Sequence, residues 1–95
     1  MNSKTEAYIG FAIKKSSVVF GCDSIEKYRK KMYLLLGTKS LSDNSLSVLQ
    51  AVADRRCIRL LQIDDCELLA KRNCKAVAIC DKSLADAILN TEISL

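Results

Sequence analysis

The sequence predicts a single α/β domain in which helices cover both faces of a four-stranded mixed sheet, giving a three-layer α/β/α sandwich. Stretches with the apolar spacing of helices alternate along the chain with short apolar runs, and this alternation is typical of α/β folds. The hydrophobic fraction of 49% in 95 residues is enough for one core, and there is no proline and only three glycines. We therefore expect one domain over residues 1–95, with about five helices and no long linker.

Five helices are predicted from apolar spacing and from residues that favour helix starts. They cover residues 3–15, 23–31, 42 or 43 to 55 or 56, 64–70, and a last helix that packs through Leu89. The expected capping residues are Ser3 with Glu6, Asp23, Asp64 with Glu67, and Asp81. Residues 91–95 are expected to fray at the end of the chain.

Four strands are predicted at residues 18–20, 32–37, 57–63 and 76–80. The runs at 32–37 and 76–80 are continuously apolar, which is typical of strands buried on both faces of a sheet. Arg59 and Gln62 interrupt the run at 57–63, so we expect that strand to lie nearer an edge.

Catalytic and metal chemistry finds little support in the sequence. Histidine is absent, and neither a phosphate-binding glycine loop nor a nucleophile elbow occurs. We therefore expect no enzyme activity and no cofactor. The cysteines include no C-x-x-C pair, so we also expect no metal site, and we interpret them as small apolar fillers. They are Cys22, Cys57, Cys66, Cys74 and Cys80.

Cys22 is the exception among the cysteines. It lies at a predicted helix start near lysines, where the pKa of a thiol can fall. A redox role therefore stays open for it, although the sequence shows no resolving partner. The polar amino-terminal residues and the lack of an apolar run near the ~20 residues that span a bilayer indicate a cytoplasmic protein with no membrane partner.

The stretch V-V-F-G-C-D-S-I-E-K at residues 18–27 is the strongest candidate for binding. A short strand ends at Gly21, which can take backbone angles closed to other residues. The following helix start lies among cations, a setting that favours an anionic partner. Residues 14–31 hold six cations and only two acids, although the net charge is a modest +4. A simply solvated face is the alternative interpretation.

Three segments resemble the ribosomal protein L-seven-Ae superfamily, the kink-turn RNA binders, and its small bacterial members above all. The first, I-G-F-A-I-K-K-S-S-V-V-F-G at residues 9–21, is similar to the bacterial pattern L-G-L-A-x-R-A-G-K-x-x-x-G. The others are Y-L-L-L-G at 33–37 and A-V-A-I-C-D-K-S-L-A-D-A-I at 76–88. The resemblance covers about residues 8–89 and implies the α/β/α fold and RNA binding.

In that superfamily an elbow G-x-N-E-x-x-K contacts the paired guanines of a kink-turn, and here it corresponds to G-C-D-S-I-E-K at residues 21–27. Gly21 and Lys27 match, whereas Asp23 and Ser24 replace asparagine and glutamate. The other RNA-facing loop precedes the last strand. It is short and basic here, K-R-N-C-K at residues 71–75, where family members commonly have L-G-x-A upstream.

The resulting expectation is a non-enzymatic, ribosomal-protein-like protein that binds a structured RNA such as a kink-turn. The expected RNA-binding residues are Gly21, Cys22, Asp23, Ser24, Lys27, Arg29, Lys30, Lys31, Lys71, Arg72 and Lys75. The alternative is a protein–protein module on the same fold that has lost specific RNA recognition. A weak homodimer or a protein partner is compatible with either function.

Overall fold

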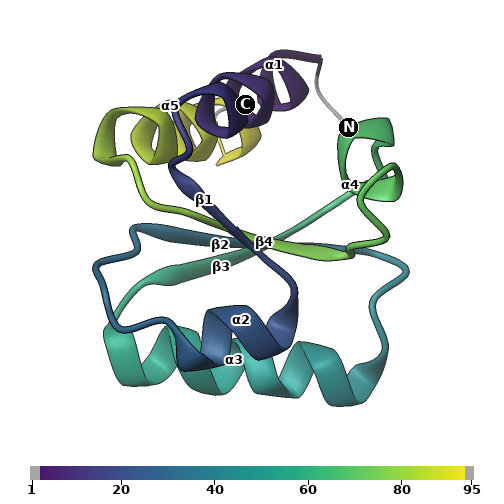
Figure 1. Ribbon diagram of the computed structural model, residues 1–95, viewed down its shortest axis with the longest axis vertical. Coiled ribbons are helices and arrows are strands. Elements are labelled where there is room, and N and C mark those ends of the chain that lie inside the picture. Colours follow the sequence, from purple (N-terminus) through teal and green to yellow (C-terminus); the bar gives the residue numbers. More distant parts are fainter. Residues whose placement is uncertain (1–2, 94–95) are drawn as a thin grey trace.

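The computed structural model describes residues 3–93 of the chain, and the side chains of residues 4–92. Within this part, five helices and four strands alternate, as expected (Figure 1). Their bounds in chain order are α1 Ser3–Lys14, β1 Val18–Phe20, α2 Cys22–Lys27, β2 Leu34–Thr38, α3 Asp43–Arg56, β3 Arg59–Ile63, α4 Glu67–Ala70, β4 Ala76–Ile79 and α5 Lys82–Ile93.

The four strands form one mixed sheet in the order β1-β4-β2-β3. β2 and β3 are parallel, whereas β4 is antiparallel to both β1 and β2. The two central strands are buried along their whole length, and the edge strand β3 exposes Arg59 and Gln62. The predicted mixed sheet, its central strands and the edge position of the third strand are therefore confirmed.

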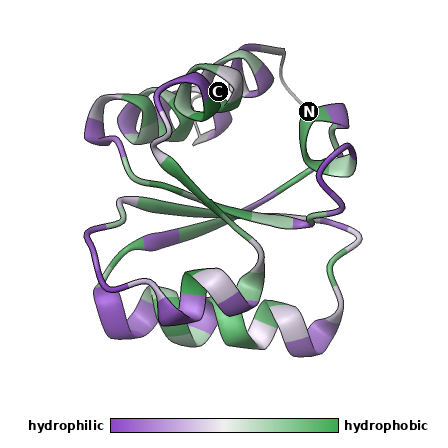
Figure 2. Ribbon diagram, in the orientation of Figure 1, coloured by the Kyte–Doolittle hydropathy of each residue, from purple (hydrophilic) through white to green (hydrophobic). Residues whose placement is uncertain are grey.

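Helices cover both faces of the sheet, and each face has its own core. α1, α4 and α5 lie on one face, and α2 and α3 lie on the other (Figure 1). Leu34 and Leu36 pack into the core under α1 and α5, whereas Leu35 packs into the core under α2 and α3. Figure 2 shows the hydrophobic sides of the helices turned toward the sheet. The twofold alternation of side chains along a buried strand explains why β2 has three consecutive leucines, which face the two cores in turn.

Three helices end in the same way, each with a non-glycine residue in the left-handed region. Ser16, Cys57 and Asn73 have φ values of 57°, 56° and 56°. In each case the following amide donates to a carbonyl five residues back, as when Ser17 N bonds Ala12 O at 2.9 Å. This pattern is a Schellman motif, in which glycine is the usual residue at the left-handed position.

The end of α2 and the start of α4 differ from the sequence predictions. α2 ends at Lys27 and not at residue 31, because Tyr28 is extended at φ −67° and ψ 130°. α4 begins at Glu67 with Cys66 before it, and Asp64 is not a cap: it forms an ion pair with Lys39 at 2.9 Å.

The carboxyl end of the chain also departs from the prediction. α5 continues to Ile93, so residues 91–93 are helical and not frayed. Thr5 of α1 donates a hydrogen bond to the carboxylate of Glu92, which ties this end of α5 to α1. The remaining predicted tail residues, 94–95, and the Ser3 side chain of the predicted capping box lie outside the described part.

Two helices begin with a side-chain cap, and of these the cap at Asp81 was predicted from the sequence. Ser42 precedes α3, and its hydroxyl accepts a hydrogen bond from Ser45 N at 3.2 Å. Asp81 precedes α5 and accepts from Leu84 N at 3.0 Å. Among the described residues, no helix has the length and apolar character needed to cross a membrane.

Candidate functional site

The first four residues of the motif at 21–27, which alone we call the elbow from here on, are fixed at the end of β1 by glycine geometry and by the neighbouring strand. Gly21 has φ 87° and ψ 146°, a conformation that side chains disfavour. Its N–H bonds Ala76 O at 3.0 Å, and its own carbonyl accepts from Ile25 N at 3.0 Å. Both backbone groups of Gly21 are thus occupied within the protein, and the chain turns from strand to helix in one residue.

Asp23 does not cap the second helix, contrary to the prediction. The N-cap position belongs to Gly21, and no side chain makes a capping hydrogen bond there. Asp23 falls inside the first turn, and its side chain and that of Ser24 are exposed. Asp23 therefore has no structural role as a helix cap. With only six residues, α2 has little macrodipole to attract an anion.

Cys22 is partly buried between the elbow and α3. Its Sγ lies 3.9 Å from the carbonyl oxygen of Ser45, which places it between the elbow and α3. Burial raises the pKa of the Cys22 thiol above its usual value, and the charges of Asp23 and Glu26 act in the same direction. The pKa reduction expected from the sequence is therefore wrong, because the thiol is partly desolvated and its nearest charges are acidic.

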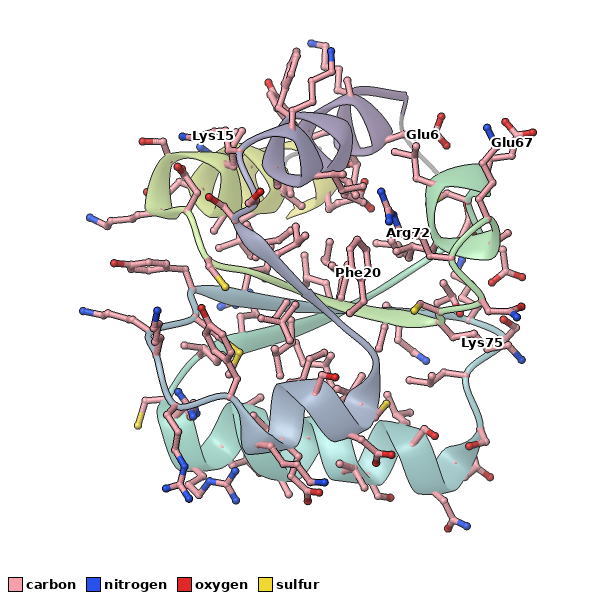
Figure 3. All side chains as sticks on the ribbon, in the orientation of Figure 1. Glu6, Lys15, Phe20, Glu67, Arg72 and Lys75 are labelled. Atoms are coloured by element: carbon pink, nitrogen blue, oxygen red, sulfur yellow. The ribbon has the colours of Figure 1, made fainter. Side chains whose placement is uncertain are left out.

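The loop at residues 71–75 is the second component of the site. Asn73 takes the left-handed position that ends the α4 turn, and Cys74 N bonds Leu69 O at 3.0 Å. The guanidinium of Arg72 lies over the ring of Phe20, 4.8 Å from its centroid (Figure 3). This contact connects the loop to the strand that leads into the elbow.

The elbow and this loop line one groove of about 360 Å³, which we call the loop groove. Ser45, in the first turn of α3, and Leu41 also line it. Antiparallel pairing of β1 with β4 brings the two segments together, since Phe20 pairs with Val77. Five of the predicted RNA-binding residues line the loop groove, namely Gly21, Cys22, Asp23, Ser24 and Lys75. Lys71 and Arg72 are exposed on the loop at 71–75 but do not line the loop groove.

The remaining predicted binding residues do not join this site. α2 runs from the elbow toward the other end of the sheet, so Lys27 lies at its far end. Arg29, Lys30 and Lys31 follow in the connection that leads to the start of β2 (Figure 1). Elbow and basic run are contiguous in sequence, but the helix between them separates them in space.

A second groove, of about 810 Å³, lies at that opposite end and was not predicted from the sequence. Its lining includes five cations, which are Arg29, Lys31, Arg55, Arg56 and Arg59. We call it the basic groove. Parallel pairing of Leu34 with Arg59 places the start of β3 beside the start of β2, which brings these cations together. The sequence signal was R-R-C-I-R at residues 55–59, at the junction of a predicted helix and strand.

A third hollow of about 300 Å³ lies next to the loop groove and shares Asn73, Cys74 and Lys75 with it. Cys66 and Asp65 also line it. All five cysteines are free thiols. Among the described residues, no group of three or more His, Cys, Asp or Glu side chains is placed to hold a metal ion.

Comparison with known proteins shows similarity in structure only. No protein-family model and no curated protein matches the sequence. Among solved structures, 26 chains match. One is a protein of unknown function from Bacillus halodurans, with a TM-score of 0.81 and 11% sequence identity; the match covers 92% of this chain and 94% of that one. The fold has therefore been seen before. At this identity the likeness extends to the fold alone.

Proposed function

We propose that this domain is a non-enzymatic, ribosomal-protein-like RNA-binding protein that recognises a structured RNA such as a kink-turn through the loop groove. One observation carries the proposal: the elbow and the loop at 71–75, separated by about fifty residues of sequence, line the same groove. These are the two segments that the L-seven-Ae resemblance assigns to RNA. We place its action in the cytoplasm as part of the same proposal.

The side chains of the loop groove suit base edges on one side and phosphates on the other. The carboxylate of Asp23 can accept hydrogen bonds from guanine N–H groups, and the hydroxyl of Ser24 can donate or accept. Lys71, Arg72 and Lys75 are exposed on the opposite loop, where they can contact phosphate oxygens. A splayed internal loop of RNA presents both groups together, whereas an A-form helix hides its base edges in a narrow groove.

The sharpest test restores the asparagine that the resembling family has at this elbow. Asp23→Asn adds a donor at the groove, and Glu26→Gln makes the same charge change at an exposed position of α2 outside the groove. Both variants are titrated with a kink-turn RNA and with a plain duplex of equal length. We expect Asp23→Asn to bind the kink-turn about tenfold more tightly than Glu26→Gln. A tenfold gain in affinity corresponds to roughly one good hydrogen-bonded contact to a base edge.

The duplex serves as the electrostatic reference. Equal gains for the two variants on both RNAs would mean that only charge matters and would contradict recognition at the elbow. Binding of the wild type to neither RNA at low salt would reject the proposal. That result would favour the alternative, a protein–protein module whose partner covers the exposed Asp23 and Ser24.

A further inference from the structure

The basic groove carries an inference beyond the loop groove. Its cations come from three separate segments: the connection after α2, the last turn of α3 and the start of β3. Arg55 and Arg56 also suit the carboxyl end of a helix, where cations offset the dipole. Arg29, Lys31 and Arg59 lie outside any helix, so that general preference does not account for them.

Arg56 holds the segment that contributes Arg29 and Lys31. Its Nη1 donates to Lys30 O at 2.9 Å, and its Nη2 donates to Tyr28 O. The guanidinium therefore clamps two alternate carbonyls of this connection. The residue between them, Arg29, lines the groove, whereas Lys30 does not. Arg56 thus positions the segment that brings Arg29 and Lys31 into the groove.

Between described residues, no ion pair involves the remaining cations of this groove. Arg29, Lys31, Arg55 and Arg59 are exposed, and none of the described carboxylates lines the groove. The ion pairs recorded between described residues join Lys15 with Asp81 and Lys39 with Asp64, away from the groove. Lys31 lies over the ring of Tyr33, 5.5 Å from its centroid. Arginine side chains left unpaired at such density favour a polyanion as the occupant.

The lining of the groove combines apolar surface with charged ends of a single sign. Met32 is 2% exposed, and Ile58, Tyr33 and Leu89 are only half-exposed or less. The exposed lining is nevertheless more apolar than polar, as is usual where the aliphatic stems of arginine and lysine line a groove. The charged ends of these side chains are all positive, which suits a phosphodiester backbone.

We infer that the basic groove binds the phosphate backbone of a second RNA segment, so that the domain bridges two RNA segments at opposite ends of its sheet. The choice of RNA as the polyanion rests on the proposed function, whereas the groove and its charge do not. Binding here is by backbone contact, without reading of sequence.

The test compares two double variants that each remove two positive charges. Arg55→Gln/Arg59→Gln alters the basic groove, and Lys71→Gln/Lys75→Gln alters the loop at the other end. A labelled RNA duplex without an internal loop is titrated into protein saturated with unlabelled kink-turn RNA, and also into protein alone. Circular dichroism checks that both variants remain folded.

We expect Arg55→Gln/Arg59→Gln to weaken duplex binding about tenfold and to reduce the salt slope of log K by roughly 1.8, as loss of two phosphate contacts on a duplex requires. Lys71→Gln/Lys75→Gln should leave duplex binding to the saturated protein within about twofold of wild type. A change below twofold for the basic-groove variant would overturn the inference. Displacement of the duplex by polyglutamate as effectively as by unlabelled duplex would also overturn it.

The experiments can reject either proposal while leaving the other standing. If kink-turn RNA does not bind but Arg55→Gln/Arg59→Gln still weakens duplex binding to the protein alone about tenfold, the loop-groove function is rejected and the basic groove stands. If kink-turn RNA binds and the basic-groove variant behaves as wild type toward the duplex, the bridging inference is rejected and the proposed function stands.

Discussion

The Arg72 guanidinium stacks over the Phe20 ring at 4.8 Å and thereby links the two loops of the candidate site through the end of β1. The elbow begins at the residue after Phe20, and the loop at 71–75 contains Arg72. The effects of substituting the two residues on the free energy of unfolding should therefore not be additive.

A double-mutant cycle of Arg72→Ala and Phe20→Leu should give a coupling of about 0.5–1 kcal/mol in the free energy of unfolding, typical of an exposed cation–π pair. Denaturant titration measures it. Arg72→Lys should retain part of the coupling because the charge stays. Strict additivity of the two single changes would show that the stacking contributes nothing.

Two glycine-to-alanine changes are expected to have opposite signs. Gly21→Ala should cost about 1–3 kcal/mol, because φ 87° is strained for any side chain even though a Cβ there meets no atom within 4 Å. Gly10→Ala lies inside α1, where its Cβ would sit 3.8 Å from Leu68 Cδ1, an ordinary contact. It should stabilise the domain by up to about 1 kcal/mol through helix propensity. Thermal unfolding of both variants measures the pair.

The left-handed end of α1 offers a stabilising change with an adjacent control. Ser16→Gly should raise the free energy of unfolding by about 0.5–1 kcal/mol, because Ser16 has φ 57° and glycine takes that conformation without penalty. Ser17→Gly, one residue on and outside that region, should lower it by about 0.4–1 kcal/mol through added freedom in the unfolded chain. Destabilisation by Ser16→Gly would contradict the Schellman interpretation.

Asp81 should contribute pH-dependent stability. The hydrogen bond from Lys15, and then that from Leu84 N, lower the pKa of Asp81 below its usual 3.8. A carboxyl whose pKa is lowered on folding stabilises the protein above its unfolded pKa and loses that effect as the pH falls through its folded pKa. The stability gap between wild type and Asp81→Asn should thus be constant near neutral pH and narrow below about pH 4.

Lys15→Gln provides the control for that experiment. In this background the gap caused by Asp81→Asn should be smaller at neutral pH, because the main cause of the lowered pKa is gone. Urea titrations across the acid range measure both comparisons. If the stability difference between wild type and Asp81→Asn widened on acidification, the lowered pKa of Asp81 would be contradicted.

Arg56 should control the order of the connection between α2 and β2. Arg56→Lys cannot hold the carbonyls of Tyr28 and Lys30 together, since a lysine lacks the planar fork. We expect faster amide exchange over residues 28–33 and a loss of about 1.5–3 kcal/mol in stability. Arg55→Lys, its exposed neighbour, should change neither. Hydrogen-exchange mass spectrometry compares Arg56→Lys with Arg55→Lys. Equal amide exchange in both variants would show that the Arg56 hydrogen bonds do not hold this connection.

Local sequence patterns determined the elements of this fold. The strand at 18–20, the helix that follows Ser42 and the cap at Asp81 were predicted because each depends on neighbours within about one turn or one strand. The burial of β4 and the exposed edge at β3 followed from apolar continuity and from Arg59 and Gln62.

Long-range contacts decided the candidate site. The sequence placed the elbow and the cations at 29–31 in one site, but α2 carries them to opposite ends of the sheet. The helix ends early where Arg56, 28 residues after Tyr28, takes up the Tyr28 carbonyl. Desolvation beside α3, together with the charges of Asp23 and Glu26, raises the pKa of the Cys22 thiol. The sequence alone thus determined which segments form helices and strands, because backbone propensity and side-chain periodicity are local. Which charges share a groove depends on strand order and register, which only the tertiary structure decided.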